Sequence, residues 1–304
     1  MLERIFHLRE NGTRPTVEVV AGVTTFMTMA YIVFLQPMIL SGQLFNSSTG
    51  MERGALAVTT CLAAAFGSVL MGLLANYPVA LAPGMGENFF FAMTVIPVCN
   101  RLVEPEAGWR LALGVVLLSG IVFTILSLFR LRQLLLRAIS PSLQFAIAGG
   151  IGLFIALLGL EHGGIIHGAP SGHYELSLAT LATRPTLVFL VGLCVTSALL
   201  ALRVRGGILW GILAAATTAG FMGMIKFPDG VVGLPPSPAP VLGQADWRGA
   251  LRHGLELLPL LAIFTFMDVF DTLGTLVGVG TQAGLMRNGE LPRAGRAFMA
   301  DALA

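Results

Sequence analysis

Two aspartates stand three residues apart in the otherwise apolar stretch FTFMDVFDTLGTLVGVGTQAG, residues 264–284. In a helix, Asp268 and Asp271 share one face, because side chains three residues apart are neighbours. A carboxylate inside the lipid layer is costly unless it is partnered, so this pair indicates a functional site. Two carboxylates this close do not both ionise easily, and we expect at least one to hold a proton, as a proton-coupled carrier requires. The structural alternative is that hydroxyls such as those of Thr272 and Thr275 satisfy the pair.

A second stretch, LAPGMGENFFF at residues 81–91, places backbone breakers where a membrane span is expected. Pro83, Gly84 and Gly86 near one end and Pro97 near the other leave room only for a half-length helix that begins near Met85. A broken span is tolerated in lipid only where its free backbone groups face protein or a water-filled cavity. The N-terminal N–H groups of this half-helix should therefore point at a ligand near the middle of the membrane.

The first turn of this half-helix carries the groups that could recognise a polar ligand. Gly86 precedes Glu87, a carboxylate, and Asn88, whose amide offers both a donor and an acceptor. Phe89 and the two phenylalanines after it could stack on a planar ligand, although packing against neighbouring helices is the favoured interpretation. Amide and aromatic groups suit a flat, neutral, hydrogen-bonding heterocycle better than an inorganic ion.

These residues must be positioned by a membrane protein. The chain has 304 residues, of which 55% are hydrophobic and only 11% charged, and its mean hydropathy is +0.83. Such values lie outside the range of soluble domains. Apolar runs of about 20 residues cross the lipid layer as helices. Eight spans are predicted, at residues 16–41, 55–76, 79–98, 110–129, 141–160, 185–204, 206–224 and 255–279.

Charges in the loops predict the orientation of these spans. More basic residues fall in the N-terminal segment and the loops on its side of the membrane than in the loops on the other side. Because cytoplasmic loops carry the excess of basic residues, we expect the N-terminus in the cytoplasm. No secretory signal precedes the first span, and residues 131–139 are typical of a short interfacial helix. A net charge of +2 indicates no nucleic-acid partner. The spacing of the three histidines at 162, 167 and 173 fits no standard zinc site, and neither a metal nor a cofactor is expected.

Hydroxyls also line one face of the first span. Thr24, Thr28 and Tyr31 follow a helical spacing, and they either bond back to their own helix or line a cavity. The stripe alone does not distinguish between these two interpretations.

Three segments together carry a family resemblance. TTFMTMAYIVFLQP, APGMGENFFF, and FMDVFDTLGTLVGVGTQAG followed by LPRAGRAFMADALA occur in this order. With these motifs the chain resembles, from about residue 14 to its end, the adenine/guanine/hypoxanthine permease branch of the nucleobase-cation symporter (xanthine/uracil permease) family.

The resemblance implies an all-α polytopic membrane fold of two inverted seven-span repeats, arranged as a core and a gate domain. Residues 1–254 would form the first repeat, with its broken third span near 79–98, and residues 255–304 the first span of the second repeat. The remainder of the family fold, including a partner half-helix, would lie beyond this sequence. We therefore do not expect residues 1–304 to transport alone.

The resemblance also implies a substrate and its contacts. Purine bases would be imported with H⁺, or alternatively Na⁺, across a bacterial plasma membrane, by a monomer or a homodimer. The family register supplies Asn88 and Asp271 as substrate contacts. Together with the residues singled out above, the set expected to bind substrate is Asn88, Asp271, Asp268, Gly86, Phe89, Thr272 and Thr28, and Asp268, Asp271 and Glu87 are expected to handle the proton. Glu87 departs from the family pattern, in which an apolar residue is expected, and we expect it to tune the pH dependence.

Two functions of other classes stay open at this stage. A membrane-embedded prenyl-transfer enzyme could hold Mg²⁺ against a diphosphate with Asp268 and Asp271. It would need a second cluster of aspartates, and Asp301 alone does not supply one. A channel would need a continuous polar pore, whereas the polar residues here gather at one depth.

Overall fold

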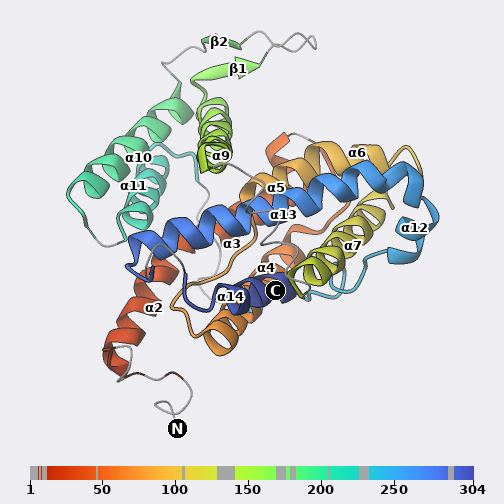
Figure 1. The fold of residues 1–304 in the computed structure, drawn as a ribbon. Helices are drawn as coiled ribbons and strands as arrows, with labels where there is room; N and C mark the ends of the chain where they lie inside the picture. Colours follow the sequence, from red (N-terminus) through yellow and green to blue (C-terminus); the bar gives the residue numbers. More distant parts are fainter. Residues whose placement is uncertain are drawn as a thin grey trace. The chain divides into compact units, whose positions relative to one another are not determined.

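A computed structural model describes residues 6, 8, 12–45, 47–104, 107–128, 141–168, 176–178, 183–204, 206–225, 233–286 and 291–304. Helices dominate these residues (Figure 1). They are α2 (Pro15–Met29), α3 (Ile32–Leu40), η1 (Gln43–Phe45), α4 (Arg53–Leu70), η2 (Met71–Ala75), α5 (Met85–Phe90), η3 (Phe91–Val95), α6 (Ile96–Cys99), α7 (Gly108–Leu128), α9 (Pro141–His162), α10 (Arg184–Ala201), α11 (Gly207–Phe221), α12 (Trp247–Arg252), α13 (Gly254–Gln282) and α14 (Ala294–Leu303). The described strands, β1 (Ile166–Gly168) and β2 (Leu176–Leu178), form a short antiparallel hairpin.

The predicted membrane spans all fall on these helices. Within the described residues, 5 helical segments are long and apolar enough to cross a membrane, and shorter apolar helices cover Met85–Cys99, Gly152–His162 and Gly207–Phe221. Large apolar side chains such as Phe34, which is 70% exposed, lie on their outer surfaces, as lipid-facing helices require. The chain is an all-α polytopic membrane protein, as predicted. The interfacial helix predicted at 131–139 and the histidine at 173 lie outside the described residues.

The first span differs from the single helix over 16–41 that we expected. Its helix α2 ends at Met29, and α3 begins at Ile32 after a turn at Ala30 and Tyr31. Neither turn residue is a proline or glycine, so no local signal in the sequence marks this break. Pro37, the helix breaker that the sequence does contain, lies inside α3 instead.

The chain divides into two compact units, each described by itself. The first comprises Met1–Glu18, Ile32–Gly149 and Pro235–Ala304, and the second comprises Val19–Tyr31 and Gly150–Leu234. The first unit therefore contains α13 together with the helices from α3 to α7. The second contains α10 and α11. The repeat boundary that the family resemblance implies after residue 254 stays a prediction.

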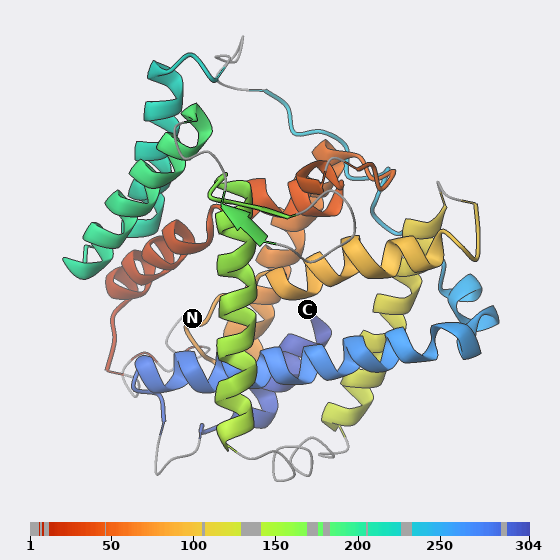
Figure 2. The same ribbon diagram turned by 90° about the horizontal axis from the view of Figure 1, so that it is seen from above.

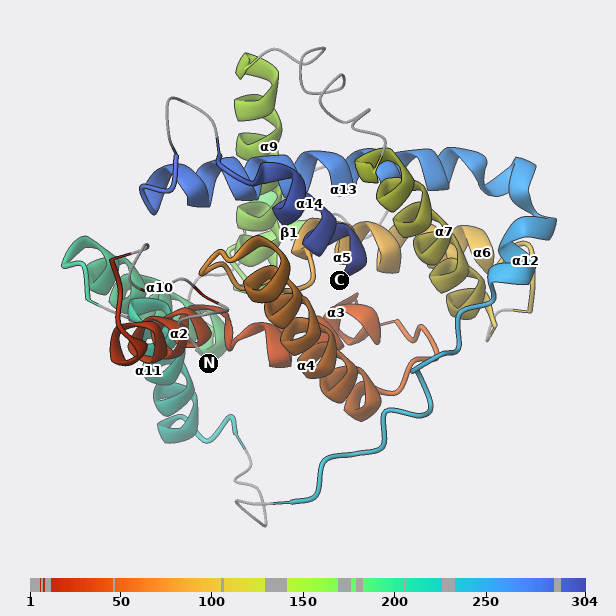
Figure 3. The ribbon, with the colours of Figure 1, turned by 60° about the horizontal axis from the view of Figure 1, so that its bottom comes forward.

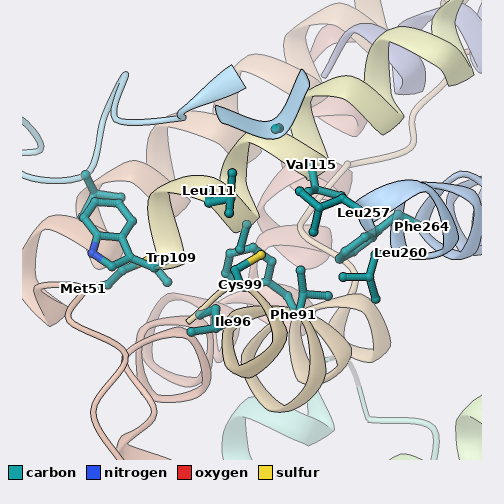
Figure 4. Close-up of a cluster of buried hydrophobic side chains, with 14 of the residues drawn as sticks. Met51, Phe91, Ile96, Cys99, Trp109, Leu111, Val115, Leu257, Leu260 and Phe264 are labelled. Carbon is teal, nitrogen blue, oxygen red and sulfur yellow. The ribbon is translucent and has the colours of Figure 1, made fainter. Parts of the chain in front are cut away.

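In the first unit, one apolar core forms where α7, η3, α6 and the first half of α13 meet. Helix α7 crosses α13 (Figure 2) and contacts it. Figure 4 shows Phe91, Cys99, Val115 and Phe264 converging from these four elements. Cys99 is 0% and Val115 1% exposed, so the half-helix that follows the break in the chain is fixed at its far end.

A second core in this unit joins η2, the later half of α13 and α14. Met71, Val269, Leu273 and Ala297 are among its buried members. Helix α14 lies beside α4 (Figure 3) and contacts both α4 and η2. Along α13, Asp268 falls between Phe264 of the first core and Val269 of the second. Asp268 therefore lies between the two apolar clusters along α13, and Asp271 lies beside the second.

The second unit is built on close contact between α10 and α11. A Cβ added to Gly192 would lie 2.9 Å from the Ala215 Cβ, and one added to Gly211 would lie 1.8 Å from the Thr196 hydroxyl. These glycines allow the two helix backbones to approach each other, as small residues do in membrane helices.

Candidate functional site

The break in the third predicted span lies where the sequence indicates it. Residues 76–84 form no helix, and Gly84 is extended (φ −68°, ψ 121°) before α5 begins at Met85. The first helical hydrogen bond of this segment runs from the Asn88 N–H to the Gly84 carbonyl at 3.2 Å. The N–H groups of residues 85–87 thus precede the helical ladder, and they form the positive end of its dipole. Gly86, a predicted substrate contact, is the second residue of α5.

Asn88 makes a contact that sequence reasoning missed. Its Nδ2 donates a hydrogen bond to Oε1 of Gln36, on α3. Gln36 is only 4% exposed, so this amide pair is held inside the first unit. A glutamine within an apolar span is the same kind of signal as the aspartates, and the rule applied to them could have found it.

The two aspartates of α13 meet the half-helix at Glu87. The side chains of Glu87 and Asp268 are hydrogen-bonded to each other. A hydrogen bond between two carboxyl groups needs a proton on one of them, because an ionised carboxylate only accepts. This contact therefore requires a proton on at least one of the two groups. Asp268 also hydrogen-bonds Ser119, a fully buried residue of α7 whose hydroxyl lies 2.8 Å from the Val116 carbonyl.

Asp271 lies on the same side of the site as Glu87. A Cβ built on Gly84 would be 3.0 Å from Glu87 Oε2 and 3.6 Å from Asp271 Oδ2. Both carboxylates thus border the backbone at the start of α5. Glycine at position 84 leaves these oxygens space beside the chain.

A fourth carboxylate completes this cluster and was not predicted as part of the site. Asp301 of α14 interacts electrostatically with Glu87, Asp268 and Asp271, and it accepts a hydrogen bond from the Thr272 hydroxyl. The carboxylate cluster, as we call these four residues, comes from α5, α13 and α14. Four carboxylates this close together do not all ionise unless cations lie beside them. Without cations, at least one of them holds a proton. The described residues contain no group arranged as metal ligands.

The remaining predicted contacts have other partners in the structure. Thr272 is 5% exposed and hydrogen-bonds Asp301 and the Asp268 carbonyl, the latter at 2.7 Å. Phe89 is 5% exposed and packs edge to face on Phe45, with ring centroids 5.6 Å apart. Their roles as substrate contacts stay predictions.

The hydroxyls of the first span bond back to their own helix. Thr24 donates to the Val20 carbonyl at 2.8 Å, and Thr28 donates to that of Thr25 at 2.6 Å. Thr24 and Thr28 therefore make local back-bonds; that this stripe, which includes Tyr31, lines a cavity stays a prediction. Thr28 belongs to the second unit, and its role toward a substrate also stays a prediction.

Comparison with known proteins identifies what this arrangement belongs to. The model of the permease family matches residues 17–304. The chain is 43% identical over 302 residues to a protein of Methanocaldococcus jannaschii whose name proposes a permease, covering 99% of this chain and 66% of the relative. It is 40% identical to a guanine/hypoxanthine permease of Bacillus subtilis (99% and 67%) and 38% identical to an adenine permease of Escherichia coli (100% and 64%).

The chain spans about two thirds of the length of these relatives. They are named as permeases, which are transporters and not enzymes. The alternative of a prenyl-transfer enzyme is therefore set aside.

Proposed function

The chain belongs to the xanthine/uracil permease family of nucleobase transporters, and from this premise we propose that it serves the import of a purine base together with a proton. The substrates proposed are adenine, guanine and hypoxanthine, which appear in the names of its relatives. As in the sequence prediction, the site faces a path across the cell membrane, and the N-terminus lies in the cytoplasm.

The observation that carries the proposal is the contact between the Glu87 and Asp268 carboxyl groups, beside a third carboxylate, Asp271. A carrier that couples base movement to a proton needs one group that binds the base and another that holds the proton. The carboxylate cluster offers both within one unit. The four carboxylates are half-buried beside the two apolar cores, where a charge is costlier than in water.

In this mechanism Asp271 accepts a hydrogen bond from an N–H group of the purine. Asn88 and the N–H groups of residues 85–87, at the start of the half-helix, would match the remaining donors and acceptors of the base. Glu87 and Asp268 share the proton, and Ser119 can donate to Asp268 when that proton leaves. Loss of the proton leaves an extra negative charge near Asp271, which favours protonation of Asp271. A protonated Asp271 accepts the N–H of the base less well, and this links proton movement to release of the base.

The proposal is tested by uptake of labelled adenine, guanine and hypoxanthine in bacteria that lack their own purine importers. The protein is expressed from its complete gene. We expect accumulation above the external concentration, its collapse on addition of a protonophore, and no change when choline replaces Na⁺. Absence of uptake of all three bases by protein present in the membrane would contradict the proposed substrates. Uptake that follows Na⁺ and ignores the protonophore would contradict the proposed coupling ion.

A further inference from the structure

Two amide side chains meet between the first span and the half-helix. Asn88 on α5 donates from Nδ2 to Gln36 Oε1 on α3, and the two helices are in contact. Gln36 is almost fully buried. Buried amides are costly without partners, so this bond holds both side chains in one arrangement.

The bond matters because an asparagine amide is nearly symmetric in shape but not in chemistry. Rotation by half a turn about its terminal bond exchanges the carbonyl oxygen and the NH₂ group. Only the NH₂ group can donate to the Gln36 carbonyl. With that bond made, Asn88 presents its Oδ1 and its second N–H in a fixed order.

The edge of a purine base distinguishes the two orientations of the Asn88 amide. Adenine presents an N6 donor beside an N7 acceptor, a pattern that one asparagine amide matches with its oxygen and its N–H. A rotated amide would set donor against donor and acceptor against acceptor. An amide held in one orientation therefore always presents to the base the donor and acceptor that match its edge.

We propose that Gln36 is a positioning residue for purine binding, which acts by fixing the orientation of the Asn88 amide. The inference rests on the proposed function, because it takes Asn88 as a contact of the base. It goes beyond that function in assigning a role to a residue of the first span that makes no contact with the base itself.

The surroundings of both side chains support this role. The residue after Gln36, Pro37, and nearby Ile39 are fully buried, and α3 also packs on α4. On α5, Phe89 packs on Phe45 directly beside Asn88. Gln36 and Asn88 therefore project from backbone segments that are each fixed by packing, and the bond between them sets a side-chain angle.

The test measures KM and maximal rate of labelled adenine uptake by the complete protein, for Gln36→Met, Gln36→Glu and the control Gln43→Met. Gln43 is an exposed glutamine of η1. Methionine keeps the length of Gln36 without its acceptor, whereas glutamate keeps a carboxyl oxygen that can accept from Asn88. We expect about a tenfold rise in KM for Gln36→Met at little change in maximal rate, and KM within about threefold of wild type for Gln36→Glu and the control.

A double-variant cycle tests whether Gln36 acts through Asn88. Gln36→Met added to Asn88→Ala should raise KM no further than Asn88→Ala alone, because no amide remains to orient. An unchanged KM in Gln36→Met, or a full further rise in the double variant, would overturn the positioning role while leaving purine transport intact. If Gln36→Met does not reach the membrane, Gln36→Thr, whose hydroxyl is too short to reach Asn88, replaces it in both comparisons. Absence of purine uptake by the wild-type protein would overturn both the proposed function and this role.

Discussion

The Thr272 hydroxyl provides a quantitative test of how the carboxylate cluster is assembled. It is buried, and it is the side-chain link between α13 and Asp301 of α14. Thr272→Val keeps the shape of the side chain and removes this hydrogen bond. A hydrogen bond contributes about 0.5–1.5 kcal/mol when both partners are neutral and about 1.5–3 kcal/mol when one is charged, so we expect the free energy of unfolding to fall by about 1.5 kcal/mol.

For a chain of this size that change lowers the unfolding midpoint by roughly 3–6 °C. The assay is thermal unfolding of the purified protein in one detergent at one scan rate, since membrane proteins often unfold irreversibly. Thr275→Val is the matched control on the same helix, because the Thr275 hydroxyl bonds only carbonyls of its own helix, at 2.8 Å and 3.3 Å. Equal midpoints for the two variants would refute the proposed link between the helices.

Two further predictions concern packing and the shared proton. A Cβ on Gly114 of α7 would lie 2.3 Å from the Asp246 backbone oxygen, so Gly114→Ala should lower the midpoint of thermal unfolding by several degrees. The control Gly120→Ala, on the same helix with open space around it, should leave the midpoint unchanged. Similar midpoints for the two variants would show that the backbone beside Gly114 can move to make room. Glu87→Gln cannot give up a proton to Asp268, so we expect uptake to persist with an altered pH profile, and an unchanged profile would exclude Glu87 from proton handling.

Local chemistry explains what could be predicted from the sequence. The half-helix begins at Met85 as expected, because Pro83 lacks the helical N–H and disfavours helix at the residue before it, and Gly84 is a poor helix former. The aspartates of α13 were recognisable because a carboxylate in an apolar run is anomalous by itself. Spacing also placed Asp268 and Asp271 toward one site, and both lie in the carboxylate cluster.

What could not be predicted depends on contacts between distant segments. Spacing within one helix says which side chains share a face, but it does not say that Glu87 meets Asp268 or that Gln36 meets Asn88. Asp301 looked like an isolated acid near the end of the sequence. Its membership in the site follows only from the packing of α14 beside α13.

Thr272 is a further residue whose contact with a distant segment could not be predicted from the sequence. Its place in a family motif predicted contact with substrate, whereas its hydroxyl is engaged by Asp301 within the protein. A motif identifies a residue that belongs to the site, whereas its partners within the protein follow only from packing; contact of Thr272 with substrate stays a prediction.

The central claim, that the carboxylate cluster binds a purine and moves a proton with it, is tested most directly at Asp271. Asp271→Asn keeps the shape of the side chain and one acceptor oxygen, but it cannot titrate. Uptake of labelled adenine, guanine or hypoxanthine by the complete protein is measured with and without a protonophore, beside the control Glu256→Gln, which alters an exposed carboxylate of the same helix. We predict that Glu256→Gln accumulates base like the wild type, and that Asp271→Asn loses protonophore-sensitive accumulation while equilibrative uptake can remain. Accumulation by Asp271→Asn against a gradient at the wild-type rate would contradict both the residue's role and the coupling mechanism.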